Sequence, residues 1–146
     1  MNRFGGTTTI ARSIDEVFAF LADGENDKKF SSRIIEIHNT TPGQHGVGTV
    51  YVSKAKDLGL TMQHKFEITA FESPTLIRWK EIPGGPAWVA EGGYDLEAVG
   101  AQTKLTFFNE IAGRGPGKLL ARLAARGGAK AADAFLASLK SAVEAS

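Results

Sequence analysis

Hydrophobic and polar residues alternate with a period of two over most of the chain from residue 33 onward. In residues 60–71, LTMQHKFEITAF, one face of the predicted strand is apolar and comprises Leu60, Met62, Phe66, Ile68 and Ala70. This period indicates strands with one buried face. Further strands are predicted over residues 33–39, 49–56, 75–82, 87–96 and 103–111, and a short Thr-rich strand over residues 4–10.

Two segments have helical spacing instead. Ser13 is followed three residues later by Glu16, which is the spacing of a capping box. An apolar stripe follows and predicts a short helix to about residue 22; it consists of Ile14, Val17, Phe18 and Leu21. A second helical turn is expected near residues 25–30.

A long helix is predicted from about residue 116 to residue 145. Its opening segment, GRGPG, contains a proline, which suits a first helical position. The expected apolar stripe consists of Leu119, Leu120, Leu123, Phe135, Leu136, Leu139 and Val143. The centre of the helix is made of small residues, with Gly127 and Gly128 adjacent, and each glycine destabilises a helix by roughly 1 kcal/mol relative to alanine. Either close packing on a sheet or empty space would explain them, and we favour a widened cavity.

The order of these elements predicts an α+β fold. Short turn sequences link the strands, among them residues 41–48 and 57–59, and short links make neighbouring strands antiparallel. The expected architecture is a curved seven-stranded antiparallel sheet wrapped around the long C-terminal helix, with two short helices after the first strand. At 146 residues the chain is long enough for a single domain, residues 1–146, with its own core.

Composition narrows the possible functions. The net charge is +1, from 17 basic and 16 acidic residues, so we expect no nucleic-acid partner. There is no cysteine, which excludes disulfides and thiolate metal ligands. No apolar run is long enough to span a membrane or to act as a secretory signal, so a cytoplasmic location is expected. The histidines lack the spacing of metal ligands, and no cofactor motif is present, so neither a metal nor a cofactor is predicted.

Five segments, in the same order, resemble a known superfamily. They are TTTIARSIDEVFAFLAD, GVGTVY, FEITAFESPTLIRW, GGYDLEAVGAQTKLTF and the closing amphipathic helix. Together they cover essentially the whole chain and are similar to the START-like helix-grip proteins (SRPBCC superfamily), most closely to the polyketide cyclase/dehydrase branch. The resemblance implies a hollow between sheet and long helix that holds a hydrophobic small molecule. Members bind lipids, sterols, polyketides or plant hormones, and some catalyse cyclisation or dehydration of polyketides.

The turns predict which residues lie opposite one another. A hairpin closed at residues 72–75 sets Ile68 opposite Trp79 and Phe66 opposite Glu81. The next hairpin, closed at residues 83–86, sets Glu81 opposite Trp88 and Trp79 opposite Ala90. The last hairpin sets Tyr94 opposite Leu105 and Ala90 opposite Asn109. With this register most charged side chains point outward, and this outward placement supports the register. Two exceptions remain on the inner face, His64 and Glu81.

His64 and Glu81 are predicted to be diagonal neighbours, with Cβ atoms roughly 7 Å apart, so that an imidazole–carboxylate hydrogen bond is possible. Tyr51 and Ser53 are expected to point inward beside His64, because Lys54 and Lys56 are then outside. The predicted ligand-binding residues are Tyr51, Ser53, Met62, His64, Phe66, Trp79, Glu81, Trp88, Tyr94, Phe107 and Asn109. Apolar and aromatic members would contact a ligand, while polar members would orient it.

Three functions stay open at this point. The first is binding of a small hydrophobic ligand that is polyketide-, aromatic- or lipid-like. The second is an enzyme, a polyketide cyclase or dehydratase, in which His64 acts as general acid or base and Glu81 tunes it, a role that imidazole suits because it titrates near neutral pH. The third is a co-chaperone-like protein-interaction module, whose interior its own side chains would fill. His64 can also be an ordinary core histidine, and both a monomer and a homodimer are compatible with the sequence.

Overall fold

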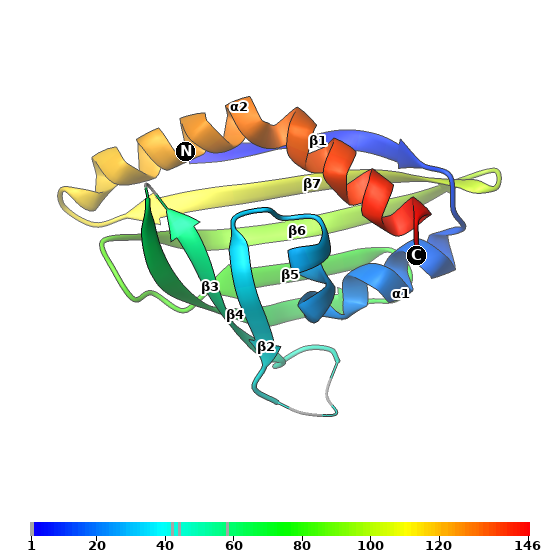
Figure 1. Ribbon diagram of the computed structural model, residues 1–146, viewed down its shortest axis with the longest axis horizontal. Helices are drawn as coiled ribbons and strands as arrows, with labels where there is room; N and C mark the ends of the chain where they lie inside the picture. The colour runs from blue at the N-terminus through cyan, green and yellow to red at the C-terminus, as the bar shows by residue number, and fades with distance from the viewer. Residues whose placement is uncertain (1, 42, 44, 58) are drawn as a thin grey trace.

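The computed structural model describes residues 2–41, 43, 45–57 and 59–146, and these form one antiparallel sheet of seven strands with two α-helices and one 3₁₀ helix. The strands lie side by side in the order β1-β7-β6-β5-β4-β3-β2 (Figure 1). Their bounds are β1 (Asn2–Ile10), β2 (Ile34–Asn39), β3 (Val50–Asp57), β4 (Leu60–Glu72), β5 (Leu76–Glu81), β6 (Ala87–Val99) and β7 (Gln102–Gly113). The predicted α+β helix-grip architecture is therefore confirmed. Residues 42, 44 and 58, which fall in two of the predicted turns, lie outside the described residues.

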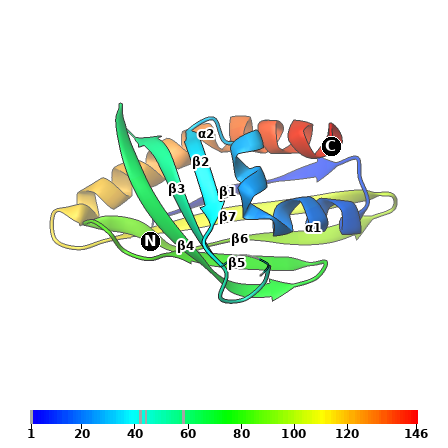
Figure 2. The same cartoon turned by 60° about the horizontal axis from the view of Figure 1, so that its bottom comes forward.

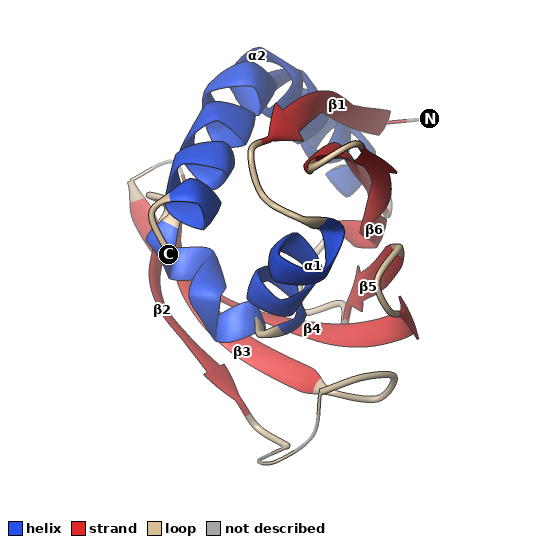
Figure 3. Cartoon of the chain, turned by 90° about the vertical axis from the view of Figure 1, so that its right-hand side faces the viewer, coloured by secondary structure: helices blue, strands red, loops and turns tan. Residues whose placement is uncertain are grey.

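The helices lie on the inner side of the curved sheet. They are α1 (Ile14–Ala22), the 3₁₀ helix η1 (Gly24–Lys29) and α2 (Gly117–Glu144). In Figure 3 the sheet curls from β1 round to β2 as an open arc, α2 runs along its open side and α1 lies within it. Strands β2, β3 and β4 rise steeply from the plane of the other strands (Figure 2). This curvature gives the sheet an inner and an outer face.

The start of α1 has the predicted cap. The Ser13 hydroxyl accepts a hydrogen bond from the Glu16 amide (3.3 Å) and donates one to Glu16 Oε1 (3.0 Å). The helix buries Val17 and Leu21 against the sheet. The cap thus fixes the point at which the chain turns from β1 into the interior.

The pairing of β4 with β5 agrees with the sequence. Ile68 lies opposite Trp79 and Phe66 opposite Glu81, as predicted. A β-bulge then follows between Ile68 and Ala70, which brings Phe71 to the inner face, where its ring packs against Phe18. The bulge lies beyond the predicted site and leaves the site register intact.

The register of the following two hairpins is shifted by two residues from the prediction. Trp79 lies opposite Gly92 and not Ala90, and Tyr94 lies opposite Phe107. The strands β6 and β7 extend further than predicted, to a tight turn at Gly100, whose φ of +62° is favourable for glycine. A shift of two residues keeps each side chain on its face, so Tyr94 and Phe107 still point inward.

Helix α2 contacts the sheet through small side chains along most of its length. It packs on β1, β7 and β6. The buried positions recur mostly every three or four residues and are Gly117, Ala121, Ala125, Ala132, Leu136, Leu139 and Val143. The predicted stripe was wrong in its first half, because Leu119 (58%), Leu120 (46%) and Leu123 (51%) are exposed. A residue two positions from Ala121 lies about 200° round the helix, so Leu119 and Leu123 are on the far side from β1.

The glycine pair in α2 has two different environments. A Cβ on Gly128 would overlap with the ring of Phe4 on β1, so this glycine permits close packing. A Cβ on Gly127 would meet no heavy atom within 4 Å. The expectation of a widened cavity was therefore wrong at Gly128, where an aromatic ring takes the place of the missing side chain.

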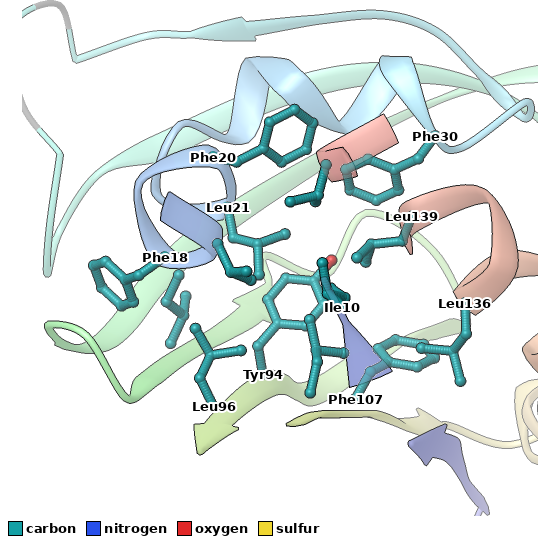
Figure 4. Packing of buried hydrophobic residues seen from close by; sticks show 14 residues of the cluster. Ile10, Phe18, Phe20, Leu21, Phe30, Tyr94, Leu96, Phe107, Leu136 and Leu139 are labelled. Carbon is teal, nitrogen blue, oxygen red and sulfur yellow. The ribbon is translucent and has the colours of Figure 1, made fainter. Parts of the chain in front are cut away.

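The hydrophobic core lies toward the end of the molecule that holds α1 and the C-terminal half of α2 (Figure 1), and Figure 4 shows how its side chains pack. It brings together side chains from both helices, from the segment after η1 and from the inner face of the sheet. Its buried members are Ile10, Val17, Phe18, Phe20, Leu21, Phe30, Ile77, Tyr94, Leu96, Leu105, Phe107, Leu136, Leu139 and Val143. The predicted site residues border this cluster.

Candidate binding site on the inner face of the sheet

Strand β3 contributes the two polar residues that the sequence placed beside His64. Ser53 lies directly opposite His64, and Tyr51 lies opposite Phe66. Tyr51 and Ser53 are 4% and 3% exposed, whereas Lys54 is exposed. The predicted inward orientation of Tyr51 and Ser53 is therefore confirmed.

His64 and Glu81 form the predicted pair. His64 Nδ1 lies 2.7 Å from Glu81 Oε2, and the carboxylate is almost fully buried. The other carboxylate oxygen accepts a hydrogen bond from the Val89 amide at 2.9 Å. The described β5–β6 pairing ends at Trp79 opposite Gly92, so the Glu81 side chain links the two strands beyond the last paired residues. A single carboxylate thus connects β4, β5 and β6 and sets the orientation of the imidazole.

Trp79 and Asn109 also bind each other. Trp79 Nε1 donates to Asn109 Oδ1 at 3.1 Å, across the intervening strand β6. The bond passes over Gly92, where a Cβ would overlap with both the Asn109 oxygen and the Trp79 nitrogen. Gly92 is required here because any side chain would occupy the path of this hydrogen bond. The Asn109 carbonyl oxygen is consequently paired within the protein.

Two of the predicted ligand-binding residues lie apart from this group. A β-bulge between Val89 and Glu91 reverses the faces of β6, so that Trp88 lies on the outer side, with the Arg114 guanidinium 5.5 Å from the centre of its ring. The predicted pairing of Glu81 with Trp88 was also wrong, because the β5–β6 register is shifted by two residues and its last described pair is Trp79 opposite Gly92. Met62 is on the inner side opposite Ala55, and at 46% exposed it lies at the edge of the site.

Trp88 instead borders an open depression of about 510 Å³ beyond the end of β5. Its lining residues are Glu67, Lys80, Glu81, Ile82, Pro83, Trp88 and Ala90. Glu67 and Lys80 are a cross-strand pair with oppositely charged side chains 3.9 Å apart. Glu81, the partner of His64, lines this depression too, so the depression adjoins the inner-face site.

Aromatic rings form a continuous apolar layer on the inner face. The Tyr94 ring packs edge-on against Trp79, with centroids 5.0 Å apart, and lies 6.2 Å from the Phe107 ring. Phe107 in turn packs against Phe135 of α2 at 4.7 Å. His64 and Phe66 lie beside each other on β4, with ring centroids 6.2 Å apart. The polar groups of the site are therefore set in an aromatic environment.

Two hydroxyl groups in this layer have no hydrogen-bond partner among the described residues: Ser53 Oγ and Tyr94 Oη. Both residues are at least nine-tenths buried. Within the described part of the chain, every side-chain oxygen or nitrogen that is sealed from solvent has a partner. It follows that these two hydroxyls are not sealed and border space that a water molecule can enter.

Tyr51 also connects the sheet to η1. Its hydroxyl accepts a hydrogen bond from the Gly24 amide at 3.1 Å, and its ring packs so closely on Gly24 that a Cβ there would lie 2.8 Å from it. Burial, together with the nearby carboxylates of η1, raises the pKa of Tyr51. Tyr51 therefore anchors η1 to β3.

Asp27, on η1, is a titratable residue that the sequence analysis did not single out. Burial, reinforced by the charge of Asp23, raises the pKa of Asp27 to about 8. Asp27 also contributes to the rise in the pKa of Tyr94, which is caused mainly by burial. In the sequence Asp27 lies in the segment GENDKK, whose mixed charges are typical of an exposed turn. Its burial could therefore be recognised only in the folded structure.

The described residues contain no group of three or more His, Asp or Glu side chains placed to hold a metal ion. Nor does this part of the chain include a helix that is both long and apolar enough to cross a membrane. The site thus consists of paired and unpaired polar groups in an aromatic layer.

The chain was compared with protein families and with known structures. The model of the family described as polyketide cyclase/dehydrase and lipid transport matches residues 1–144. No curated protein matches the sequence significantly.

Many solved structures share the fold. TTHA0849 from Thermus thermophilus is 17% identical over 98% of this chain and 97% of its own, with a TM-score of 0.79. The ZhuI aromatase/cyclase from Streptomyces sp. R1128 is 17% identical over 98% of this chain and 91% of its own, with a TM-score of 0.73. A START superfamily protein from Mycobacterium smegmatis is 15% identical over 98% and 94% of the two chains, with a TM-score of 0.69.

Proposed function

Because this chain belongs to the polyketide cyclase/dehydrase and lipid-transport family, we propose that it binds a small hydrophobic molecule in a cavity between the inner face of the sheet and α2. The ligand is polyketide-, aromatic- or lipid-like. The observation that carries the proposal is the pair of unpaired hydroxyls, Ser53 and Tyr94, buried in an aromatic layer. Both hydroxyls border space that a water molecule can enter, and a bound molecule would replace that water as their hydrogen-bond partner.

The side chains around these hydroxyls have complementary roles in this proposal. Phe66, Trp79 and Phe107 provide apolar contact area, and His64 provides a polar group held in one orientation by Glu81. This composition, mostly aromatic with a few placed polar groups, is typical of small-molecule sites.

The direct test is native mass spectrometry of protein purified from its source, which is expected to reveal a co-purified small molecule. Replacing His64 with alanine is then expected to weaken binding of that molecule by about tenfold, the effect of losing a polar contact of roughly 1.4 kcal/mol. Thr7→Ala, at an exposed position of β1, is the control and should bind as wild type. Full affinity in the His64 variant would remove His64 from the site.

A second candidate function is catalysis of polyketide cyclisation or dehydration, favoured by the 2.7 Å contact between His64 and Glu81. In an aldol cyclisation His64 would remove a proton from the carbon next to a substrate carbonyl, while Glu81 holds the imidazole in place. The electron pair left on carbon would then attack a second carbonyl, whose oxygen takes up a proton. Ser53, directly opposite His64, is near enough in the sheet to donate a hydrogen bond to a substrate oxygen.

Turnover of a poly-β-ketone separates the two candidates. If the protein is an enzyme, the His64→Ala variant should bind the substrate and fail to cyclise it. The Glu81→Gln variant retains a hydrogen-bonding side chain and should keep partial activity with an altered pH profile. Binding without consumption by the wild-type protein would leave ligand binding as the function.

The interaction-module alternative is the least supported of the three. It requires an interior filled by the protein's own side chains. The unpaired hydroxyls of Ser53 and Tyr94 argue against such filling.

A further inference from the structure

The N-terminal half of α2, residues 117–131, exposes large apolar side chains to solvent. Leu119, Leu120 and Leu123 are between 46% and 58% exposed. A single exposed leucine is ordinary on a protein surface, but three within five consecutive positions form an apolar patch, which is typical of an interaction surface.

The residues of this half of α2 fall into three sectors around the helix axis. Ala121 lies in the sector that packs on the sheet. At about 100° per residue, the three leucines lie roughly 160–260° round the axis from Ala121. The lysines and arginines from residue 118 to residue 130 lie roughly 60–180° from Ala121. The exposed surface of the helix therefore has an apolar sector with a basic sector beside it.

The basic sector is locally unbalanced in charge. The segment 114–132 contains five basic residues and no acidic residue, although the whole chain has a net charge of only +1. All five are exposed, and none forms an ion pair with a described residue. They are Arg114, Lys118, Arg122, Arg126 and Lys130. This part of the surface thus attracts anions while the molecule as a whole is nearly neutral.

The hairpin of β3 and β4 adds a second apolar element at the same end of the molecule. Leu60 is 65% and Met62 is 46% exposed. Figures 1 and 2 both show this hairpin at the end that holds the N-terminal half of α2, away from the core. A lipid bilayer can accept apolar side chains from separate elements in one plane, while its headgroups contact the cations beside them. A second copy of the chain fits this surface less well, because two basic surfaces repel each other.

We propose that the N-terminal half of α2, together with the β3–β4 hairpin, docks on the surface of an anionic lipid membrane. The leucines enter the boundary between headgroups and acyl chains, and the arginines and lysines contact lipid phosphates. Lys130 lies within the apolar sector, and its long side chain can extend past the leucines to the headgroups. The docking surface goes beyond the proposed function, since it requires no ligand in the cavity.

Vesicle flotation tests the docking surface directly. The two probes are vesicles of phosphatidylcholine alone and vesicles in which about 30% of the lipid is phosphatidylglycerol. We expect the protein to bind the anionic vesicles at least about tenfold more tightly than the neutral ones, because each cation near an anionic surface contributes several-fold to affinity. Raising the salt concentration should weaken this binding.

Two double variants separate the apolar from the basic contribution. Leu119→Ser with Leu123→Ser should weaken binding to the anionic vesicles at least about tenfold, because less apolar surface leaves water. Arg122→Gln with Arg126→Gln should also weaken it at least about tenfold, and should leave any binding to neutral vesicles unchanged.

Exposed residues at the opposite end of the molecule provide matched controls. Val99→Ser replaces a 51% exposed apolar residue at the β6–β7 turn, and Lys104→Gln replaces an exposed cation of β7. Both controls should bind the vesicles as wild type. All the substituted positions are exposed, so every variant should keep the thermal unfolding midpoint of wild type.

Several outcomes would overturn the docking surface. Equal binding to the two kinds of vesicle, or binding to neither, would do so. Binding to soluble polyglutamate without binding to vesicles would assign the surface to an acidic protein instead. Self-association in sedimentation velocity that Leu119→Ser with Leu123→Ser abolishes, again without vesicle binding, would assign it to a contact between copies of the chain.

Discussion

At the scale of single residues, the site depends on side chains that link strands where the backbone pairing ends. Glu81 accepts from the Val89 amide and contacts His64, and thereby joins three strands with one carboxylate. Trp79 and Asn109 make a similar link over Gly92. These contacts leave the imidazole and the indole little freedom, which favours binding because few rotamers are lost when a ligand enters.

Asp27 gives a prediction about pH. Its pKa is about 8 in the folded protein and 3.8 ordinarily, so between these values the folded state holds a proton that the unfolded state has released. Stability should therefore fall as pH rises from about 4 to 8, by up to about 1.4 kcal/mol per pH unit from this group, and level off above pH 8. Asp23 reinforces the rise in the pKa of Asp27, and the phenols of Tyr51 and Tyr94, whose pKa values are raised as well, stay neutral in this range.

Urea unfolding of wild type and Asp27→Asn at pH 5, 7 and 9 measures this effect. The variant cannot ionise, so its stability relative to wild type should increase from pH 5 to pH 9. If the difference in the free energy of unfolding between the variant and wild type stays constant across the three pH values, the pKa of Asp27 is not raised in the folded protein.

At the scale of elements, α2 approaches the sheet through small residues, and its two glycines differ in what surrounds them. Gly127 has open space where a side chain would be, and Gly128 has the Phe4 ring. The contrast arises because adjacent helical residues are about 100° apart, so that only one of the two faces β1.

The glycine pair gives a matched prediction. Gly127→Ala should raise the free energy of unfolding by about 1 kcal/mol through helix propensity alone. Gly128→Ala has the same propensity gain but places a methyl group against the Phe4 ring, so we expect no net gain or a loss of about 1–3 kcal/mol. Chemical denaturation of both variants checks this.

The Phe4→Leu background provides a control for the pair. This substitution removes the ring that blocks Gly128. In the Phe4→Leu background Gly128→Ala should therefore lower the free energy of unfolding less than it does in wild type, while the effect of Gly127→Ala should be the same in both backgrounds. Equal effects of the two alanines in wild type would contradict the packing described for α2.

At the scale of the whole molecule, the core lies at one end and the candidate site lies beside it. The C-terminal half of α2 buries Leu136, Leu139 and Val143, whereas the N-terminal half buries only small residues and exposes its leucines. Local stability follows buried apolar area, so it should be uneven along the helix.

Hydrogen exchange tests this asymmetry. Amides in residues 119–128 are expected to exchange at least about tenfold faster than those in residues 132–143, because opening the first half exposes little additional apolar surface. Uniform protection along α2 would mean that the helix opens only with global unfolding.

The strand pattern, the antiparallel order and the inward position of His64 beside Ser53 and Glu81 could all be predicted from the sequence. Each of these features depends on the alternation of apolar and polar residues along a strand and on the strong preference of charged side chains for water. Both can be recognised in a single amino-acid sequence. The pairing of Phe66 with Glu81 followed from one hairpin turn that the sequence marks clearly.

What the sequence determined by itself was therefore which residues share a face within each unbroken stretch of alternation. Only the tertiary structure decided where a bulge reverses that alternation and where the faces meet. The bulge that moves Trp88 outward needs one extra residue whose identity carries no signal, and it reverses every side chain beyond it. Burial is a property of the assembled surroundings, so the raised pKa of Asp27 could be recognised only in the folded molecule.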